Sequence, residues 1–298
     1  LQFLRLVKLR LPYDKIELMP KIGAHVSASG GLYTAIENAK AIGAETIQIF
    51  GSSPRQWFTR IPPEPEIEKY RAYLEDSDID PVFLHAAYLV NLASPDDVIR
   101  LKSVKSLADH LNIVQLIGAA GLIFHIGSGK EMPREQAEEE VVRGVKEVLR
   151  RVPGQARLIM ENSAGGGQKL GGSAEGIRHL LQGIDSPRVK VCFDTAHALE
   201  AGIIESYLPS NIKELLNDWD EKIGLENIVA IHANDSKTPF NSHHDRHENI
   251  GYGYIGLAGF KNLAKEKRVR EKPWILEVPG FENQGPDKEN INILKSCF

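Results

Sequence analysis

Cysteine is scarce in this sequence of 298 residues, which contains only Cys192 and Cys297. Two cysteines cannot build a disulfide framework, so small disulfide-stabilised secreted proteins are excluded and a reducing, cytoplasmic location is expected. The sequence also lacks any apolar run near the roughly 20 residues that cross a bilayer, so we expect no membrane partner. An excess of positive charge is missing too, because 36 lysines and arginines face 40 acidic residues, a net charge of −4. Nucleic-acid binding would therefore depend on local charge or on bound cations.

The remaining composition is ordinary for a globular protein, with 42% hydrophobic and 26% charged residues. A chain of this length can form one large α/β barrel or two medium domains. Residues 1–20 mix apolar side chains with Arg5, Lys8 and Arg10, which interrupt the apolar core that a signal peptide needs. We expect residues 1–20 to form an extension outside the main fold. Residues 21–298 should form one domain, because no linker or low-complexity tract divides them.

Short β-rich runs alternate with longer helical patterns from residue 21 onward. Most of the short runs are continuously apolar, as expected for parallel strands that are buried on both faces. The predicted strands are Ile22–Val26, Thr46–Phe50, Val82–His85, Leu122–Ile126, Leu158–Glu161, Val189–Phe193, Ile228–Ile231 and Trp274–Val278. Between them, helices are predicted to begin at Ser94 as an N-cap, at Pro133 and at Ser173. Eight such strand–helix units predict an α/β fold of the (β/α)8 TIM-barrel class.

Each of the last six predicted strands has a histidine, glutamate or aspartate at its C-terminal end or one residue from it. These residues are His85, His125, Glu161, Asp194, His232 and Glu277. In a TIM barrel such strand ends surround one mouth, where active sites are found. One polar residue at a strand end would be interpreted as a hydrogen-bonded structural residue. Six strands in succession favour a shared site, because charged groups are rarely buried without partners.

Three further candidate ligands lie close to these strand ends in the sequence. His197 follows the sixth strand, and Asp245 and His247 lie in a histidine-rich stretch after the seventh. Nine His, Asp and Glu side chains exceed the three or about four protein ligands of one zinc ion, and they suit two or three ions. This ligand chemistry fits Zn²⁺, Mn²⁺ or iron, and such clusters hydrolyse phosphoesters. We interpret His110 and His179, which lie within helical patterns, as surface residues.

Many separate motifs connect the sequence with one enzyme family. They are Gly23-Ala24-His25-Val26-Ser27, Arg55-Gln56-Trp57, Tyr88-Leu89-Val90-Asn91-Leu92, Phe124-His125, Glu161-Asn162, Asp194-Thr195-Ala196-His197, His232-Ala233-Asn234-Asp235-Ser236-Lys237, Asp245-Arg246-His247 and Leu276-Glu277. On these motifs the chain resembles endonuclease IV, the metal-dependent apurinic/apyrimidinic (AP) endonucleases of base-excision repair. Two positions depart from the usual family pattern, since Ile126 replaces a proline and Tyr252 replaces a glutamate. Neither position is a predicted metal ligand.

The resemblance implies three zinc ions, with Mn²⁺ or iron as alternatives at some sites, on a TIM barrel. The implied ligand sets are His85 and His125 with the bridging Glu161, then Glu161 with Asp194, His232 and Glu277, and finally His197, Asp245 and His247. The implied reaction hydrolyses the phosphodiester immediately 5′ to an abasic site in duplex DNA and leaves a 3′-hydroxyl and a 5′-deoxyribose phosphate. Glu161 would be essential because it joins two ions. Bound cations would also reconcile the acidic chain with DNA binding, and we expect the protein to act as a monomer.

The resemblance also implies side chains that contact DNA. Arg55 matches an arginine in an early loop of the family, and Tyr88 and Leu89 match a pair that follows the third strand. In the family these groups fill the gap left by the extruded nucleotide, which suits a site that has already lost its base pair. His25 ends the first strand and should lie behind the metal ligands or contact the substrate.

Two other functions compete with this one. A sugar isomerase or epimerase on a similar barrel would also use a divalent metal, but it would need fewer ions and a pocket for a free sugar. The set of His197, Asp245 and His247 argues against it, as does the Arg55-Gln56-Trp57 motif. The second alternative is a barrel that binds metal or damaged DNA without catalysis. A complete ligand set disfavours it, because buried ligands without an ion would be costly.

Overall fold

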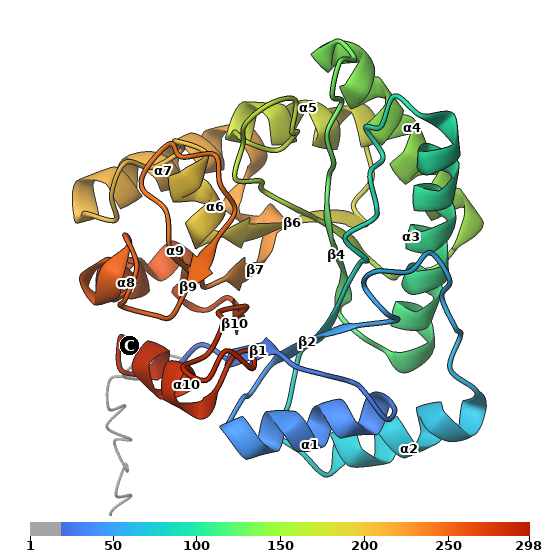
Figure 1. The fold of residues 1–298 in the computed structure, drawn as a ribbon, viewed down its shortest axis with the longest axis horizontal. Helices are drawn as coiled ribbons and strands as arrows, with labels where there is room; N and C mark the ends of the chain where they lie inside the picture. Colours follow the sequence, from blue (N-terminus) through green and yellow to red (C-terminus); the bar gives the residue numbers. More distant parts are fainter. Residues whose placement is uncertain (1–18) are drawn as a thin grey trace, which may run out of the picture.

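The computed structural model describes residues 19–298, and in this part of the chain eight parallel strands close into a barrel (Figure 1). Their order around the barrel is β1-β10-β7-β6-β5-β4-β3-β2. The strands are β1 (Ile22–His25), β2 (Ile47–Phe50), β3 (Val82–His85), β4 (Gly121–His125), β5 (Leu158–Glu161), β6 (Val189–Asp194), β7 (Ile228–His232) and β10 (Trp274–Leu276). The chain closes the ring where β1 pairs with β10, with Ile22 beside Trp274. The predicted TIM-barrel class is therefore confirmed.

The observed strands match the predicted ones to within one or two residues at each end. The bounds of β3 and β5 are as predicted, whereas β10 ends at Leu276 rather than at Val278. β6 and β7 each continue one residue further than predicted, through Asp194 and His232. These two candidate ligands therefore belong to the barrel wall itself, where the backbone ladder fixes their positions.

Helices surround the barrel on its outside (Figure 1). They are α1 (Leu32–Ile42), α2 (Glu64–Glu75), α3 (Asp97–Ile117), α4 (Arg134–Arg151), α5 (Ala174–Ile184), α6 (Thr195–Glu200), α7 (Pro209–Ile223), η1 (Leu225–Asn227), α8 (Gly256–Ala264), α9 (Lys267–Arg270) and α10 (Lys288–Lys295). The last helix, α10, packs beside α1 and β1, so the two ends of the barrel domain meet. A separate two-stranded hairpin of β8 (Asp235–Ser236) and β9 (His247–Glu248) lies in the loop after β7.

The helix starts follow the predicted capping chemistry except at α3. Ser173 caps α5, because its hydroxyl accepts a hydrogen bond from the Gly176 N–H at 3.1 Å. The prediction that Ser94 caps α3 was wrong by two residues. Asp96 is the N-cap, since its carboxylate accepts from the Val98 N–H at 2.8 Å. The Ser94 hydroxyl instead accepts from the Asp96 N–H at 3.2 Å and shapes the turn before the helix.

His110 is buried, with 1% of its surface exposed, so its prediction as a surface residue was wrong. Its ring lies beneath the loop after β2, where it approaches the Ser52 hydroxyl to 3.0 Å and the Ser106 carbonyl oxygen to 2.7 Å. A Cβ at Gly51 would come within 2.8 Å of the ring, so this loop needs glycine at that position. Helical periodicity alone could not show that a loop covers this face of α3. His179 is exposed, as predicted.

The predicted extension, residues 1–20, lies almost wholly outside the described residues, so it stays a prediction. Among the residues that are described, none of the helices combines the length and the apolarity that a bilayer crossing requires. The interior of the barrel and the faces between strands and helices are filled by buried aliphatic and aromatic side chains. This packing holds the strand ends rigidly enough to position a site.

Candidate metal centre

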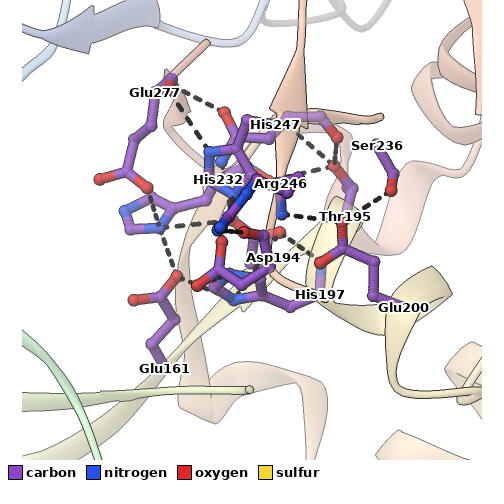
Figure 2. Close-up of polar contacts among 12 residues, drawn as sticks. Glu161, Asp194, Thr195, His197, Glu200, His232, Ser236, Arg246, His247 and Glu277 are labelled. Atoms are coloured by element: carbon purple, nitrogen blue, oxygen red, sulfur yellow. Dashed lines mark hydrogen bonds and ion pairs between the residues drawn. The ribbon is translucent and has the colours of Figure 1, made fainter. Parts of the chain in front are cut away.

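The six candidate residues from the strand ends lie together at one mouth of the barrel. Strand pairing sets His125 beside Glu161 on β4 and β5, and Asp194 beside His232 on β6 and β7. Figure 2 shows that Glu161 and Glu277 approach the same central group of side chains from one side. The convergence that the sequence predicted from separate strands is therefore present in the fold.

Glu161 is the residue on which the imidazole rings converge. Its carboxylate is 1% exposed. One oxygen, Oε2, lies 3.0 Å from Nε2 of His125 and 3.3 Å from Nε2 of His85. The other, Oε1, lies 2.9 Å from Nδ1 of His232 and 3.3 Å from Nδ1 of His197. Each carboxylate oxygen thus faces a different pair of histidines, which is the arrangement that a bridging ligand requires.

The electrostatics of this carboxylate follow from its neighbours. Burial by itself would raise the pKa of Glu161, because the anion loses its hydration. The neighbouring His232 and His125 rings outweigh that effect, and the pKa lies well below its usual range. Glu161 is therefore an anion at neutral pH, and a buried anion of this kind is suited to holding cations.

A second group of carboxylates surrounds the same nitrogen of His232, Nδ1, that Glu161 approaches. Glu277 Oε2 lies 3.3 Å and Asp194 Oδ2 lies 3.8 Å from Nδ1 of His232. Glu161, Asp194, His232 and Glu277 each offer one ligating atom within 4.8 Å of the others. Three carboxylates in so small a volume repel one another unless positive charge lies between them.

A third group combines α6 with the hairpin of β8 and β9. α6 starts immediately after β6, and the Asp194 carboxylate caps it by accepting from the His197 N–H at 2.8 Å. This cap points His197 into the mouth, where its Nε2 lies 3.3 Å from Asp245 Oδ2. Nε2 of His247, at the start of β9, lies 3.7 Å from Asp245 Oδ1. The long loop after β7 is thereby connected to the strand ends.

Metal ions fit this arrangement, judged by its unsatisfied atoms. Nε2 of His197 and Nε2 of His247 are buried without a hydrogen-bond partner, although a buried polar atom normally has one. His85, His125 and Glu161 also offer ligating atoms within 4.8 Å of one another. Imidazole and carboxylate ligands of this kind suit zinc, manganese or iron. The unpartnered ring nitrogens are available to ligate such ions.

Three polar residues outside the predicted ligand sets support the candidate ligands, and two of them, Asn162 and Asn234, belong to the family motifs. The Gln48 side chain contacts Nε2 of His232 at 2.8 Å and Nδ1 of His25 at 2.9 Å. The Asn162 carbonyl oxygen contacts Nδ1 of His197 at 2.9 Å, and Asn234 donates to Asp194 Oδ2 at 2.7 Å. Such contacts fix ring orientation and ligand basicity. The sequence offered one sign of Gln48, because it is the polar residue between Ile47 and Ile49 in an otherwise apolar strand.

His25 lies where the sequence placed it, at the mouth and behind a candidate ligand. Its Nδ1 is 3.6 Å from Oε1 of Glu277. Burial lowers the pKa of His25, although the Glu277 carboxylate partly opposes that shift. A neutral ring beside Glu277 can orient the carboxylate without taking up its charge.

Asp235 organises the loop that contains the family departure at Tyr252. Its buried carboxylate accepts hydrogen bonds from the backbone N–H groups of Gly251, Gly253 and Ile255, at 2.9 to 3.0 Å. A Cβ at Gly253 would lie 2.5 Å from that carboxylate, so the close approach needs glycine. Tyr252 itself points outward and is 66% exposed. The backbone of this loop is thus fixed independently of the Tyr252 side chain.

A cavity of about 1630 Å³ opens above the candidate ligands. His85, His125 and Glu277 line it, and Arg55 and Tyr88 lie on its wall. The sequence therefore placed these two predicted DNA contacts correctly beside the mouth, while their function stays a prediction.

Tyr88 and Leu89 are both accessible from solvent. The Tyr88 side chain is 62% exposed, and its ring centroid lies 5.4 Å from that of Phe50 and 6.1 Å from that of His85. Partial burial, together with the nearby Glu277 carboxylate, raises the pKa of Tyr88 to about 12, so its hydroxyl is neutral. Leu89 is 36% exposed but does not line the cavity. An exposed aromatic ring beside the mouth is available for stacking.

Comparisons with known proteins agree with this geometry. Residues 36–297 match the family model described as a xylose isomerase-like TIM barrel. The chain is 35% identical over 276 residues to a probable endonuclease 4 of Halothermothrix orenii, covering 92% of this chain and 99% of that protein. It is 38% identical to a probable endonuclease 4 of Solibacter usitatus, covering 93% of this chain and 96% of the relative.

Solved structures distinguish proteins that share the family from proteins that share only the fold. The structure of endonuclease IV from Thermus thermophilus matches with a TM-score of 0.82 and 34% identity, covering 93% of this chain and 98% of that one. A D-tagatose 3-epimerase-like protein matches with a TM-score of 0.67 but only 18% identity, so it shares the fold alone. The predicted resemblance is confirmed: the chain belongs to the endonuclease IV family of xylose isomerase-like TIM barrels.

Proposed function

We propose that the protein is a DNA-repair AP endonuclease that hydrolyses the phosphodiester 5′ to abasic sites in duplex DNA. The products would be a 3′-hydroxyl and a 5′-deoxyribose phosphate. The observation that supports the proposal most is the placement of Glu161, whose two carboxylate oxygens face different pairs of histidines. Membership of the endonuclease IV family supports DNA as the substrate.

Three divalent cations, mostly zinc, would occupy the mouth in this proposal. The proposed ligand sets are His85, His125 and Glu161, then Glu161, Asp194, His232 and Glu277, and finally His197, Asp245 and His247. When bound, such ions supply Lewis acidity, which makes water a stronger nucleophile and stabilises negative charge on a phosphodiester. The chain contributes rigid positions and supporting hydrogen bonds, of which Gln48 and Asn234 provide the clearest examples.

Binding of DNA needs the cations as well as the protein. The mouth contains Glu161, Asp194, Asp245 and Glu277, and the chain as a whole carries a net charge of −4. This charge would repel a phosphate backbone in the metal-free protein. Cations bound among the carboxylates would reverse the local field and admit the scissile phosphate.

The wall of the cavity would recognise the damage. Arg55 supplies a permanent charge and a flat guanidinium, and Tyr88 supplies an exposed ring beside it in the same cavity. Both groups can stack on bases that flank a gap, and Leu89 can add an apolar contact. The abasic nucleotide has no base to unstack, so its extrusion into the mouth costs less than that of an intact nucleotide.

A sugar isomerase or epimerase is the competing function. The similarity to barrels named as sugar epimerases, at 14% to 18% identity, supports the fold alone. His197, Asp245 and His247 form an additional ligand group that a site with fewer ions would not need. The open, acidic mouth with an exposed arginine on its wall also suits a polymer better than a small neutral sugar.

An incision assay tests the proposal. The substrates would be a duplex oligonucleotide with one abasic site and the same duplex with an intact base. We expect incision only at the abasic site, with a new 3′ end that a DNA polymerase extends. Removal of metal with a chelator should abolish incision, and added zinc should restore it. Activity that survives metal removal, or metal-loaded protein that leaves abasic DNA intact but epimerises ketoses, would contradict the proposal.

A further inference from the structure

Glu200 is a buried acidic residue beside the metal centre that belongs to none of the proposed ligand sets. It is the last residue of α6, one turn beyond His197, and its exposed fraction is 0%. Figure 2 shows it on the side of the site opposite Glu161, next to Ser236. A fully buried carboxylate is rare in proteins unless it has a partner, so Glu200 requires an explanation.

The two oxygens of Glu200 have different surroundings. Oε1 accepts hydrogen bonds from the Ser236 hydroxyl at 2.7 Å, the Thr238 hydroxyl at 3.2 Å and the Arg246 N–H at 3.2 Å. Oε2 is buried and has no hydrogen-bond partner. The loop after β7 therefore satisfies one oxygen completely and leaves the other free to bind something else.

The Glu200 carboxylate lies among candidate metal ligands. Glu200, His197 and Asp245 each offer one ligating atom within 4.8 Å of the others. Nε2 of His197 is also buried without a hydrogen-bond partner. The buried Glu200 carboxylate and the partly exposed Asp245 carboxylate repel each other, and a cation between them would remove the repulsion and satisfy both unpartnered atoms together.

We infer that Glu200 supplies a further carboxylate oxygen, Oε2, to the ion that His197, Asp245 and His247 would hold. This inference rests on the metal centre proposed above. With Glu200, the third ion would have four protein ligands. A zinc ion with four protein ligands has the closed coordination of a structural site, whereas three ligands leave a position open for water or substrate. The third ion would then have as many protein ligands as the second, and it should contribute chiefly to anchoring the loop after β7.

A competing role for Glu200 is to hold this loop through Oε1 alone. The two roles separate in a pair of variants. Glu200→Gln keeps an oxygen that can accept the three hydrogen bonds but loses the charge and the second oxygen. Ser236→Ala removes one hydrogen bond to Oε1 and leaves Oε2 intact. Metal-free protein of each variant and of the wild type would be titrated with zinc in competition with a chelator, and its thermal unfolding measured.

We expect Glu200→Gln to weaken the binding of one zinc ion by at least about tenfold, to leave the other ions unchanged, and to leave metal-free unfolding unchanged or raised in temperature. Ser236→Ala should bind all ions as the wild type does. Wild-type affinity in Glu200→Gln, or equal weakening in Ser236→Ala, would overturn the inference. Wild-type protein that binds no zinc would overturn the proposed function itself, so the two failures are distinguishable.

A second measurement needs no variant and therefore does not depend on the folding of Glu200→Gln. Crystals of the zinc-loaded wild type would be examined by anomalous scattering at the zinc edge. We expect an ion at about 2.0–2.2 Å from Glu200 Oε2, in contact with the side chains of His197 and Asp245 as well. An occupied third site with Oε2 outside the coordination sphere would overturn the inference.

Discussion

Two layers of side chains fill the interior of the barrel, and the same six strands supply both. The apolar layer consists of Phe83, Ile123, Ile159, Cys192, Ala230 and Ile275. The mouth layer lies two residues further along each strand or its extension and consists of His85, His125, Glu161, Asp194, His232 and Glu277. Residues two positions apart point to the same face of a strand, so the mouth layer lies directly above the apolar layer. A shift of two residues separates the part that stabilises the barrel from the part that is proposed to hold the metal ions.

The two layers differ in what their burial does to the free energy of folding. Each square ångström of apolar surface buried in the apolar layer contributes about 25 cal/mol. Burial raises the pKa of Cys192 to about 11, so its thiol is neutral and belongs with the aliphatic residues. In the mouth layer, burial of Glu161 and Asp194 carries a desolvation cost, which the neighbouring histidines offset and bound cations would offset further. Changes in the mouth layer should therefore affect function, and changes in the apolar layer should affect stability.

The sharpest test of this division is Glu161→Gln. The amide keeps the shape of the side chain but removes the charge that would hold two cations together. Loss of an essential metal contact costs several kcal/mol in the transition state, so abasic-site incision should fall at least about a thousandfold. The metal-free variant should still fold, as its cooperative thermal unfolding would show. Near wild-type incision would show that Glu161 has no part in the reaction.

Ile159→Ala makes the complementary change, two residues before Glu161 on the same strand. The truncated side chain leaves a cavity in the apolar layer, and we expect the free energy of unfolding to fall by about 2–5 kcal/mol. Zinc content should be unchanged, and incision at a temperature well below unfolding should stay within about tenfold of the wild type. Denaturant unfolding and the incision assay measure both. A variant that keeps its stability but loses its metal would break the comparison between the layers.

Changes to the cavity wall should affect the recognition of DNA without affecting metal binding in the mouth layer. Arg55→Ala with Tyr88→Ala removes two side chains from the cavity wall but no candidate ligand. Stacking of one base is worth about 1–3 kcal/mol, so affinity for abasic duplex should fall at least about tenfold with metal content unchanged. Affinity for undamaged duplex should fall much less, because that binding rests on phosphate contacts. Gel-shift titrations would measure the affinity for both duplexes. An equal loss of affinity for the two duplexes, or a large drop in unfolding temperature, would instead indicate that these side chains serve in packing.

The smallest expected effect is on the pH dependence of stability. It concerns His110, a buried histidine that lies outside the mouth layer. Burial lowers its pKa, so the folded protein keeps it neutral while the unfolded chain protonates it near pH 6.5. Its contribution to stability is therefore present above about pH 6.5 and is lost as the pH falls, by at most about 1.4 kcal/mol per pH unit. Unfolding free energies at pH 7 and pH 5 should differ less in His110→Gln than in the wild type. The exposed His179→Gln is the control, and equal pH dependence in all three proteins would contradict the assignment.

The sequence predicted the mouth layer well because a barrel turns linear order into spatial convergence. Each strand end could be recognised from a run of apolar residues, and the fold rule then brought His85, Glu161 and Glu277 together without knowledge of any contact. The same reasoning fails where position depends on packing between distant segments. The burial of His110 depends on the loop after β2, which periodicity within α3 cannot show.

The sequence patterns also could not identify the residues that lie next to the candidate ligands and are not among the predicted ligands themselves. Gln48 is one polar residue in a strand, and its contact with His232 depends on how β2 faces β7 across the barrel. Glu200 continues the spacing of Asp194 and His197 at three-residue intervals, a helical pattern that was visible in the sequence. Its importance appears only with the loop after β7, whose hydroxyls satisfy one of its oxygens and not the other.

The most direct test of the mouth layer as a metal centre is the metal content of the purified protein. Elemental analysis of the wild type, purified without chelators and without added metal, would count the transition-metal ions bound to each chain. The nine candidate side chains provide for two to about three ions, mostly zinc, when each ion takes three or four ligands, some of them shared. We predict a content in that range, which should drop in Glu161→Gln. No more than one tightly held ion per wild-type chain would contradict the account.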